Sequence, residues 1–499
     1  MTKQHRMNFT KKLLLIAAFI AAAGSLQAQD DRPSMKDYMD AKKAAFGKHV
    51  QQKESEFDAY RREANAKFAA KMAQAWQRFD MEPPKVDPTE PDPVTPPVRE
   101  KEPTVPTMPI KPGGTITPPP VEPPRPNPIP KPTVPETPKP NEKWFNFNFF
   151  NTPCKVRLDN SLKFKLSSID EKSLAAVWQQ LSGETSNALV ADCFRLIDEM
   201  NLCDWGAIRL FKSLGEAYLG KGTNEAVFFQ MYLMTQTGYK SRIGRMGDYL
   251  VILVPFDGEV YEMSYYNKGG VPFYNITGKK GNQGCLIYDE VFPNERMASL
   301  RPKQPVLAER LSEARTFTTE RYPDMTVRVQ VNRNLMDFYD TYPHCTQNNM
   351  VYANLSERVK QAVYPTFRKA LEGKPVDEAA NMLLHFMHKA FDYMSDLEQF
   401  EYERPFFGDE SFWFPYNDCE DRAILYCILI RDLLGLDAVL LEYPGHMATA
   451  IALPKEVQGA YLDLGGKRYL FCDPTFIGSN IGEMPKSRRN VQPKAIIIK

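Results

Sequence analysis

A proline-rich segment sets the first limit on how this chain can fold. Residues 82–143 hold 23 of the chain's 41 prolines, in runs such as Pro118-Pro119-Pro120. Proline fixes φ, lacks an N–H donor and favours an extended polyproline II backbone, so this segment cannot form a packed core of its own. We predict a disordered, semi-rigid linker over residues 82–143. A ligand for a proline-binding domain is the alternative interpretation.

The beginning of the chain has the pattern of a secretory signal peptide, which we assign to residues 1–28. Basic residues, among them Arg6, precede an apolar stretch at 13–24 that is too short to cross a bilayer. Small residues up to Ala28 predict cleavage after that position. We therefore expect an exported protein, periplasmic or extracellular, with no transmembrane span after signal cleavage.

Residues 29–81 are rich in Ala, Lys, Glu, Gln and Arg, and this composition favours a helix or a helical hairpin. Large apolar side chains are spaced irregularly there, several of them three or four residues apart: Phe46, Phe57, Tyr60, Phe68, Met72 and Trp76. The segment is either a solvated helix with a modest docking face, or a helix that presents residues 33–80 to a partner in the cell envelope.

Length, charge and cysteine content narrow the function classes. A chain of 499 residues has room for two or three domains, and its net charge of +1 gives no argument for nucleic-acid binding. Eight cysteines without a C-x-x-C pair fit neither a disulfide framework nor a structural zinc site. Helical patterns follow the linker around residues 171–182, 188–200 and 205–219.

The most informative residues for chemistry lie near the C-terminus. Cys419 follows the cap-type residues Asn417 and Asp418 and precedes the apolar run 424–430, which predicts a helix that begins at this cysteine. The helix should end near Gly435. The helix dipole lowers a thiol pKa, whereas nearby carboxylates raise it, so a nucleophilic cysteine here requires a histidine partner.

Three short strands should follow the helix, at residues 436–443, 446–453 and 467–472. His446 begins the second strand and Asp473 follows the third. A thiol, an imidazole and a carboxylate that orients the imidazole are the parts of a nucleophilic triad.

This helix–strand–strand–strand unit resembles the transglutaminase-like superfamily of papain-like Cys-His-Asp proteins. The resemblance rests on Asp-Cys-Glu-Asp at 418–421, on His446 at a strand start, and on an aromatic-rich strand that ends in Asp473-Pro474. Asn417 stands where members usually have glycine. The resemblance implies an α+β fold with a transglutaminase-like or papain-like core, in which a helix packs on an antiparallel sheet.

The resemblance also implies roles for four residues. Cys419 would be the nucleophile, His446 the general base and Asp473 the group that orients the imidazole. Family members complete the oxyanion hole with an upstream Gln, Trp or Tyr, and Trp413 is our candidate. Each of the four also has a structural interpretation, as a core thiol, a strand-start histidine, a strand-ending aspartate and a buried aromatic residue.

We therefore predict an exported cysteine hydrolase that acts on amide bonds of a protein or peptide substrate. One alternative is a non-catalytic scaffold or binding protein of the cell envelope, because the superfamily includes members that have lost catalysis. The other is a transamidating cross-linker. No cofactor or metal is expected, and His385 and His388 are assigned to the core or surface because no carboxylate ligand is placed beside them.

A second stretch, from residue 222 onward, aligns with the C-terminal motifs. Gly222 falls on Cys419, Gly247 or Asp248 falls near His446, and Ser264 or Tyr265 falls near Asp473. We predict a degenerate transglutaminase-like domain over residues 144–335 and a catalytic one over 336–499. The alternative is an unrelated helix, strand and hairpin unit.

Overall fold

The fold was analysed in a computed structural model. It describes residues 42, 56, 58–86, 108–113, 143–183, 185–279, 284–346 and 348–498. The chain divides into two compact units, residues 1–57 and 58–499, and all that follows concerns the second. The predicted signal peptide at residues 1–28 lies outside the described residues. So do most of the predicted linker and most of the predicted helix before residue 58.

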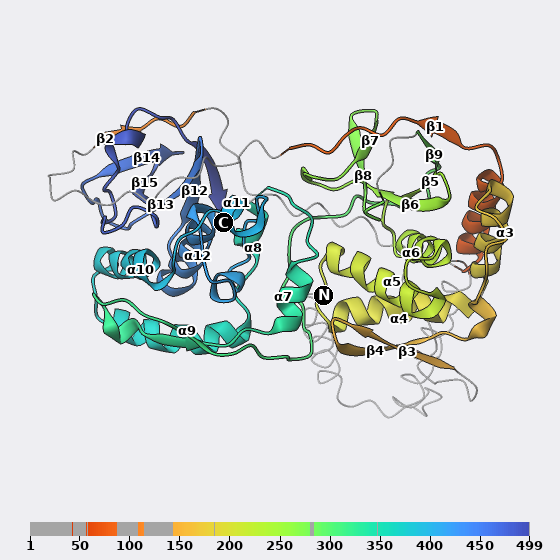
Figure 1. Ribbon diagram of the computed structural model, residues 1–499, viewed down its shortest axis with the longest axis horizontal. Coiled ribbons are helices and arrows are strands. Elements are labelled where there is room, and N and C mark those ends of the chain that lie inside the picture. Colours follow the sequence, from red (N-terminus) through yellow and green to blue (C-terminus); the bar gives the residue numbers. More distant parts are fainter. Residues whose placement is uncertain are drawn as a thin grey trace, which may run out of the picture. The chain divides into compact units, whose positions relative to one another are not determined.

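The second unit is a mixed α+β fold of helices and antiparallel sheets (Figure 1). Its first six-stranded sheet has the order β1-β9-β5-β6-β8-β7. The bounds of these strands are β1 Gln77–Phe79, β5 Arg242–Met246, β6 Tyr249–Val254, β7 Tyr265–Lys268, β8 Val271–Asn275 and β9 Cys285–Tyr288. Four helices precede β5: α3 Glu171–Leu181, α4 Thr185–Glu199, α5 Asp204–Leu219 and α6 Asn224–Gln236. The first three coincide with the predicted helices, and β3 (Trp144–Phe149) pairs with β4 (Thr152–Arg157) beside them.

The second six-stranded sheet has the order β16-β12-β13-β15-β14-β2. Its strands are β2 Met108–Ile110, β12 Ala438–Tyr443, β13 His446–Ile451, β14 Ala460–Leu464, β15 Lys467–Cys472 and β16 Lys494–Ile498. The helices of this part are α7 Arg333–Tyr339, α8 Asn348–Tyr352, α9 Glu357–Leu371, α10 Val376–Ala390, α11 Asp396–Phe400 and α12 Cys419–Leu429, which continues into the π-helical turn η4 Ile430–Leu434. A short ribbon of β10 (Arg315–Phe317) and β11 (Val327–Val329) completes it.

The two sheets repeat one topology. Five antiparallel neighbours, β9-β5-β6-β8-β7 in the first sheet, have the same chain order as β16-β12-β13-β15-β14 in the second. In each, a helix packs on the hairpin that follows it: α6 on β5–β6 and α12 on β12–β13. Both hairpins turn through two residues, between Met246 and Tyr249 and between Tyr443 and His446. The predicted duplication of a transglutaminase-like domain stays a prediction.

The sixth strand of each sheet comes from the N-terminal part of the chain. In the first sheet β1 pairs antiparallel with β9, and in the second β2 pairs parallel with β14. Because β2 lies inside the proline-rich segment, the prediction of a linker without regular structure is wrong for residues 108–110. Pro109 sits at the middle of β2, which is an edge strand, where a missing N–H can face away from the sheet.

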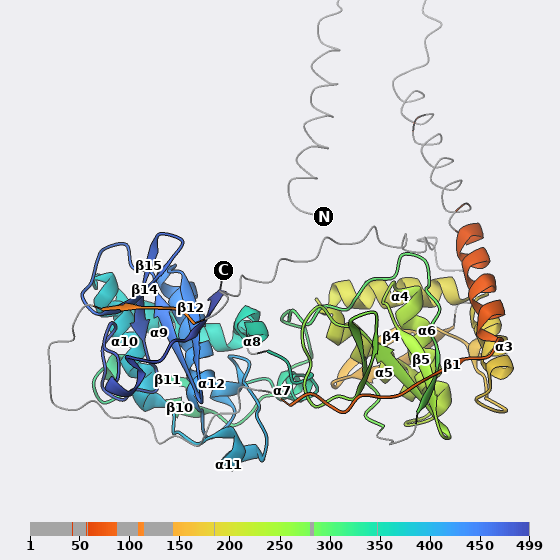
Figure 2. The ribbon, with the colours of Figure 1, turned by 90° about the horizontal axis from the view of Figure 1, so that it is seen from above.

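The described part of the N-terminal helix, residues 58–72, docks on its own chain. Phe68 packs against the rings of Trp178 (4.7 Å between centroids) and Tyr288 (4.8 Å), and Tyr288 donates its hydroxyl to the Phe68 carbonyl at 2.6 Å. The helix lies alongside α3 in both views (Figures 1 and 2). It ends before β1, so the predicted helix is wrong for residues 77–79.

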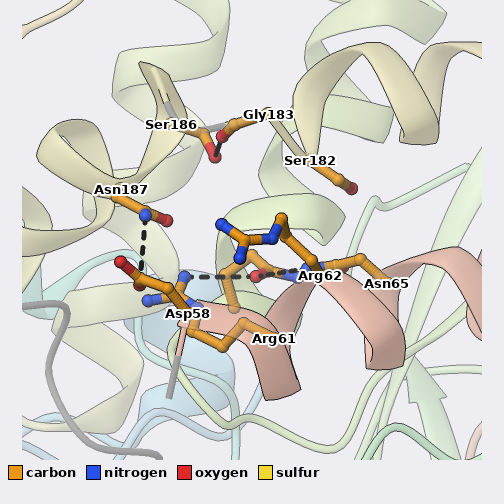
Figure 3. Close-up of a pocket in the computed structure, with 9 residues that line it drawn as sticks. Asp58, Arg61, Arg62, Asn65, Ser182, Gly183, Ser186 and Asn187 are labelled. Carbon is orange, nitrogen blue, oxygen red and sulfur yellow. Dashed lines mark hydrogen bonds between the residues drawn. The ribbon is translucent and has the colours of Figure 1, made fainter. Parts of the chain in front are cut away.

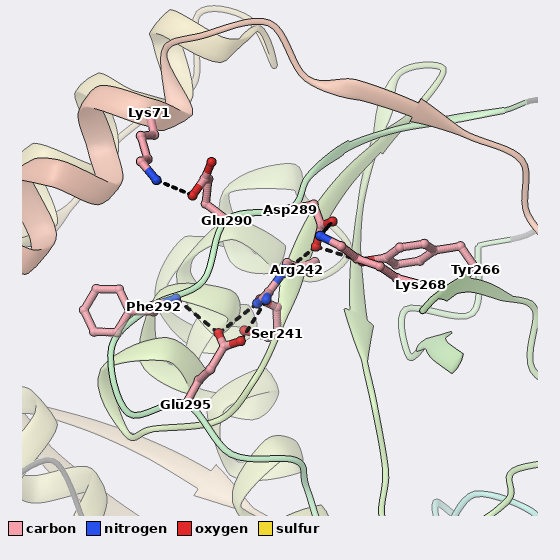
Figure 4. Close-up of polar contacts among 9 residues, drawn as sticks. All are labelled: Lys71, Ser241, Arg242, Tyr266, Lys268, Asp289, Glu290, Phe292 and Glu295. Carbon is pink, nitrogen blue, oxygen red and sulfur yellow. Dashed lines mark hydrogen bonds and ion pairs between the residues drawn. The ribbon is translucent and has the colours of Figure 1, made fainter. Parts of the chain in front are cut away.

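A buried ion-pair network fastens the loop after β9 to β5 (Figure 4). Arg242 donates to Asp289 at 2.9 Å and, through two nitrogens, to Glu295 at 2.8 and 2.9 Å. Lys71 on the docked helix reaches the same loop through Glu290 at 2.6 Å. The pairing of Arg242 with two carboxylates offsets the cost of burying these charges, which gives the network a structural role.

Candidate active site

Cys419 is the first residue of α12, as the sequence predicts. The Asp418 side chain caps the helix, accepting from the backbone N–H of Asp421 while the Asp421 side chain accepts from the Asp418 N–H, which is a capping box. The helix ends at Gly435, whose φ of 65° is the left-handed conformation that glycine adopts readily. The thiol is therefore held at a helix N-terminus that the local sequence fully specifies.

His446 and Asp473 meet through the pairing of β13 with β15. His446 opens β13, Asp473 follows the last residue of β15, and the His446 Nε2 lies 3.0 Å from Asp473 Oδ2. The Asp473 carboxylate accepts in this bond, so Nε2 of His446 is the donor. The other oxygen of Asp473 accepts from the backbone N–H groups of Thr475 (2.9 Å) and Phe476 (3.2 Å).

The Asp473 carboxylate is kept ionised by these partners. The side chain is fully buried, and burial alone would raise its pKa. The charge of His446, the hydrogen bond from its imidazole and the N–H of Thr475 outweigh burial, so the pKa of Asp473 lies below its ordinary value.

A hydrogen bond from a backbone N–H links Cys419 to β13, the strand that begins with His446. Met447, the residue after His446, donates its N–H to Cys419 Sγ at 3.4 Å. The thiol therefore lies beside the first residues of β13. Nε2 of His446 faces Asp473, and the contact of β13 with the thiol is the one from Met447. The structure thus brings three of the predicted residues, Cys419, His446 and Asp473, into one place.

The thiol of Cys419 is protonated at rest. Burial raises its pKa well above the ordinary value, and the charges of Glu420 and Asp418 raise it further, while the Met447 N–H lowers it. Sγ donates to Glu420 Oε2 at 3.0 Å. The influence of the helix N-terminus is thus outweighed by burial and by two neighbouring carboxyl groups.

Glu420 belongs to a buried group of four carboxyl residues that could hold a metal ion. Asp396, Glu403, Asp418 and Glu420 each offer an oxygen, and the four oxygens lie within 4.8 Å of one another. Burial and the charge of Glu403 raise the pKa of Glu420 to about 7. Sequence reasoning missed this group because its members come from separate segments without a ligand-type spacing.

His388 is a second residue that sequence reasoning missed. Its Nε2 donates to the Asp473 carbonyl at 3.0 Å, and its Nδ1 accepts from the Gly478 N–H at 3.3 Å. Both ring nitrogens are used, so the imidazole is neutral. Burial lowers the pKa of His388 to about 4. Its buried place is one of the two expected locations, core or surface, and the side chain also braces the loop that carries Asp473.

Trp413 is the fourth predicted site residue. It follows the 3-10 turn η3 (Glu410–Phe412) and is half-buried. Arg315 donates to its carbonyl oxygen at 2.8 Å, and its ring packs against Phe414. Among the contacts described for it, none runs to Cys419, so its role in an oxyanion hole stays a prediction.

The first sheet has a residue that corresponds to Cys419. Asn224 is the first residue of α6, after a capping Thr223, as Cys419 is the first residue of α12. The second residue of β6, Leu250, donates its N–H to Asn224 Oδ1 at 2.9 Å. This matches the bond from Met447, the second residue of β13, to Cys419 Sγ. Asn224 therefore takes the position of the thiol.

Two parts of the predicted alignment are corrected by this match. Gly222 lies two residues before α6, so the prediction that it replaces Cys419 is wrong. Gly247 and Asp248 form the hairpin turn, and the first residue of β6, Tyr249, stands where His446 opens β13. Helix caps and hairpin registers decide the match here, and neither could be read from the sequence alone.

The third part of the alignment is also corrected. Ser264 and Tyr265 were expected near the Asp473 position, but Tyr265 begins β7, which corresponds to β14. The counterpart of β15 is β8, which pairs with β6 and ends at Asn275. Ile276 and Thr277 follow it, so no carboxylate comes next in the chain.

A small cavity lies apart from these residues, between the docked helix and α4 (Figure 3). It is lined by Asp58, Arg61, Arg62, Asn65, Ser182, Gly183, Ser186, Asn187 and Gln236. Its volume of about 10 Å³ is the space of about one water molecule. Such a cavity is too small for a substrate.

Comparison with protein-family models, with curated proteins and with solved structures found no match to this chain. All eight cysteines are buried. Within the described residues, no helix combines the length and the apolar character that a membrane crossing needs.

Proposed function

We propose that the protein is a cysteine hydrolase of amide bonds, with a transglutaminase-like core around Cys419, His446 and Asp473. The observation that carries the proposal is one connected arrangement. Asp473 orients His446 through a 3.0 Å bond, and the residue after His446 donates its N–H to the Cys419 thiol at 3.4 Å. Cys419, His446 and Asp473 would then have the three roles of a triad: nucleophile, base and the carboxylate that orients the base.

The proposed reaction starts from the protonated thiol. Sγ of Cys419 attacks the carbonyl carbon of an amide while His446 Nδ1 takes the thiol proton. The oxyanion forms near the free backbone N–H of Cys419 at the start of α12, where the helix dipole favours negative charge. His446 then returns the proton to the leaving amine, and water hydrolyses the thioester. Trp413 is the proposed second oxyanion donor.

Substrate entry has to uncover the nucleophile. Cys419 is 3% exposed and His446 is 7% exposed, so a peptide reaches Sγ only after some covering segment moves. Burial also explains part of the raised thiol pKa. While no substrate is bound, the closed site keeps the thiol protonated and protects it from oxidation.

A non-catalytic scaffold is the second candidate function. It is favoured by the closed, protonated thiol, and by the first sheet, where Asn224 and Tyr249 occupy the corresponding positions and supply neither nucleophile nor imidazole. Transamidation requires an amine to replace water as the acceptor in the second step. Export to the periplasm or the cell exterior is part of the proposal, on the signal-like sequence at 1–28.

An activated ester tests the proposal directly. With p-nitrophenyl acetate, the wild-type protein should release a burst of p-nitrophenol and carry an acetyl group on Cys419 in a peptide mass map. Cys419→Ala should abolish the burst, and His446→Ala should slow it by about 10²–10⁴-fold. Cys427, buried in the same helix, is the matched control thiol and should stay unmodified. Release by wild type no faster than by Cys419→Ala would exclude the catalytic proposal.

A further inference from the structure

A basic turn lies against the hairpin that leads into His446. This turn, η5 (Lys486–Arg488), follows β15 and precedes β16. Arg488 donates from Nη1 to the Pro444 carbonyl oxygen at 3.2 Å, and its guanidinium carbon lies 5.6 Å from the centre of the Tyr443 ring. Tyr443 is the cross-strand partner of His446 across a two-residue turn. The positive charge of Arg488 is therefore held beside the turn that begins the strand of the proposed base.

The charge of this turn has no carboxylate partner. Within the part of the chain that the structure describes, neither Arg488 nor Arg489 forms an ion pair, and both side chains are partly exposed. Nε of Arg489 is buried without a hydrogen-bond partner. The neighbouring carboxylate of Glu442 is already paired with Lys494 at 3.0 Å. A guanidinium has parallel N–H donors that suit a carboxylate, and Arg488 keeps Nε and Nη2 for such a contact.

The acidic residues next to the thiol do not offset this charge at the surface. The three carboxyl residues of the tetrapeptide 418–421 are at most 3% exposed, so they face the protein interior. Asp392 is exposed, and its carbonyl accepts from the Asn417 N–H at 2.9 Å, which places it where α12 begins. The exposed charges named here therefore differ in sign: negative on the side of the thiol and positive on the side of the imidazole.

We propose that Arg488, with Arg489 next to it in the chain, selects substrates whose leaving group carries a carboxylate. The inference rests on the proposed hydrolysis and names the substrate class of that site. His446 returns the thiol proton to the leaving amine, so the leaving part of the substrate lies on the side of the imidazole. Arg488 is on that side, and its free N–H groups bind the carboxylate while the amide carbonyl lies at Cys419.

Two aryl acetates test the leaving side directly on the full-length protein. 4-Nitrophenyl acetate and 3-carboxy-4-nitrophenyl acetate transfer the same acetyl group to Cys419 and differ by one carboxylate on the leaving phenol. Each acylation rate is divided by the rate of the same ester with free cysteine, which removes the intrinsic reactivity. The carboxylated ester should then react about 3–10-fold faster with wild type. The preference should shrink as sodium chloride is added, because salt screens exposed charges.

Variants of Arg488 test the residue by sign. Arg488→Gln keeps an N–H donor for the Pro444 carbonyl and removes the charge, so the ratio of the two rates should fall to about one. Arg488→Glu should invert the ratio, because like charges repel. Arg368→Gln is the matched control: it removes a guanidinium on α9 that lies 5.4 Å from the Tyr364 ring, and it should keep the wild-type ratio. Both esters are measured on the same protein, so partial unfolding lowers both rates and leaves the ratio unchanged.

Three results would overturn the inference. A corrected wild-type ratio of one or less shows that no carboxylate is selected on the leaving side, although Cys419 is acylated. An equal fall of the ratio in Arg488→Gln and Arg368→Gln assigns the preference to net charge and not to Arg488. Reaction of neither ester with wild type faster than with Cys419→Ala removes the proposed hydrolysis, and this inference with it. The first two results leave the hydrolysis standing, so the two failures are distinguishable.

Discussion

His388 donates its Nε2 proton to the backbone carbonyl of Asp473 at 3.0 Å. The other ring nitrogen accepts from the Gly478 N–H at 3.3 Å, so one buried imidazole holds both ends of the turn that carries Asp473. Asp473 in turn orients His446. Two hydrogen bonds therefore position the proposed base, His446. One joins His446 to the Asp473 side chain, and the other joins the Asp473 carbonyl to His388 on α10.

We predict that His388→Ala impairs the proposed reaction without removing any reacting group. The carbonyl of Asp473 and the N–H of Gly478 would lose their partner, which costs about 1–3 kcal/mol in a buried site. The acetylation rate at Cys419 should fall, and the fall should come in the rate constant of the acylation step rather than in substrate affinity. Stopped-flow release of p-nitrophenol measures both.

His388→Gln is the control for this prediction. A glutamine amide can donate to one group and accept from another, as the imidazole does. It should recover at least part of the acylation rate that His388→Ala loses. If both variants react as fast as wild type, the bracing of Asp473 has no part in positioning the base.

The neutral state of His388 predicts how stability depends on pH. The pKa of His388 is lowered from 6.5 to about 4 by burial, so between these values the unfolded chain binds a proton that the folded chain does not. The contribution of His388 to stability is therefore complete above pH 6.5 and is lost as pH falls towards 4, with a total of about 3 kcal/mol.

Urea unfolding at pH 4.5 and pH 7 measures this dependence. The difference in unfolding free energy between wild type and His388→Gln should be larger at pH 7 than at pH 4.5, since glutamine does not titrate. Glu420, whose pKa is raised, changes the pH dependence of stability in the opposite direction in both proteins. The comparison of wild type with His388→Gln cancels this contribution. Asp473, with a lowered pKa, titrates below this window. A pH-independent difference would contradict a neutral, buried His388.

Asn224→Ala should destabilise the first sheet. Asn224 accepts from the Leu250 N–H and donates to the Asp248 carbonyl, both at 2.9 Å, so it fastens α6 to the β5–β6 hairpin. Leaving the buried Leu250 N–H unpaired should cost about 1–3 kcal/mol in urea unfolding. Cys419→Ala, at the corresponding position, should cost less because sulfur is a weak acceptor. Equal costs would argue against the equivalence of the two positions.

Much of the local structure around Cys419 could be predicted from sequence. The cap at Asp418, the glycine that ends the helix at residue 435, and the strand starting at His446 are short-range signals, and each is confirmed. The order of cysteine, histidine and aspartate on these elements then followed. Whether the three groups catalyse a reaction is not fixed by those signals.

The remaining features depend on contacts between distant segments. The strand at 108–110 exists because the edge of β14 offers it a partner, although its composition favours an extended, unpaired chain. The bracing by His388 joins α10 to a turn 85 residues later. The correspondence of Asn224 with Cys419 depends on a hairpin register that the sequence alignment of Gly222 with Cys419 does not give.

Glu420→Gln should make Cys419 more reactive. Glu420 Oε2 accepts the thiol proton at 3.0 Å, and its charge is the largest contribution, after burial, to the raised pKa of Cys419. A neutral amide of the same shape removes that charge, so more thiolate should form at a given pH. Each unit by which the thiol pKa falls raises the thiolate fraction about tenfold.

Alkylation of Cys419 by iodoacetamide, followed from pH 6 to 9 in EDTA, should therefore accelerate in the variant. Glu410→Gln, a buried carboxyl paired with Arg404, is the matched control and should leave the rate unchanged. If Glu420→Gln alkylates more slowly than wild type at every pH, Glu420 assists thiol ionisation instead of opposing it.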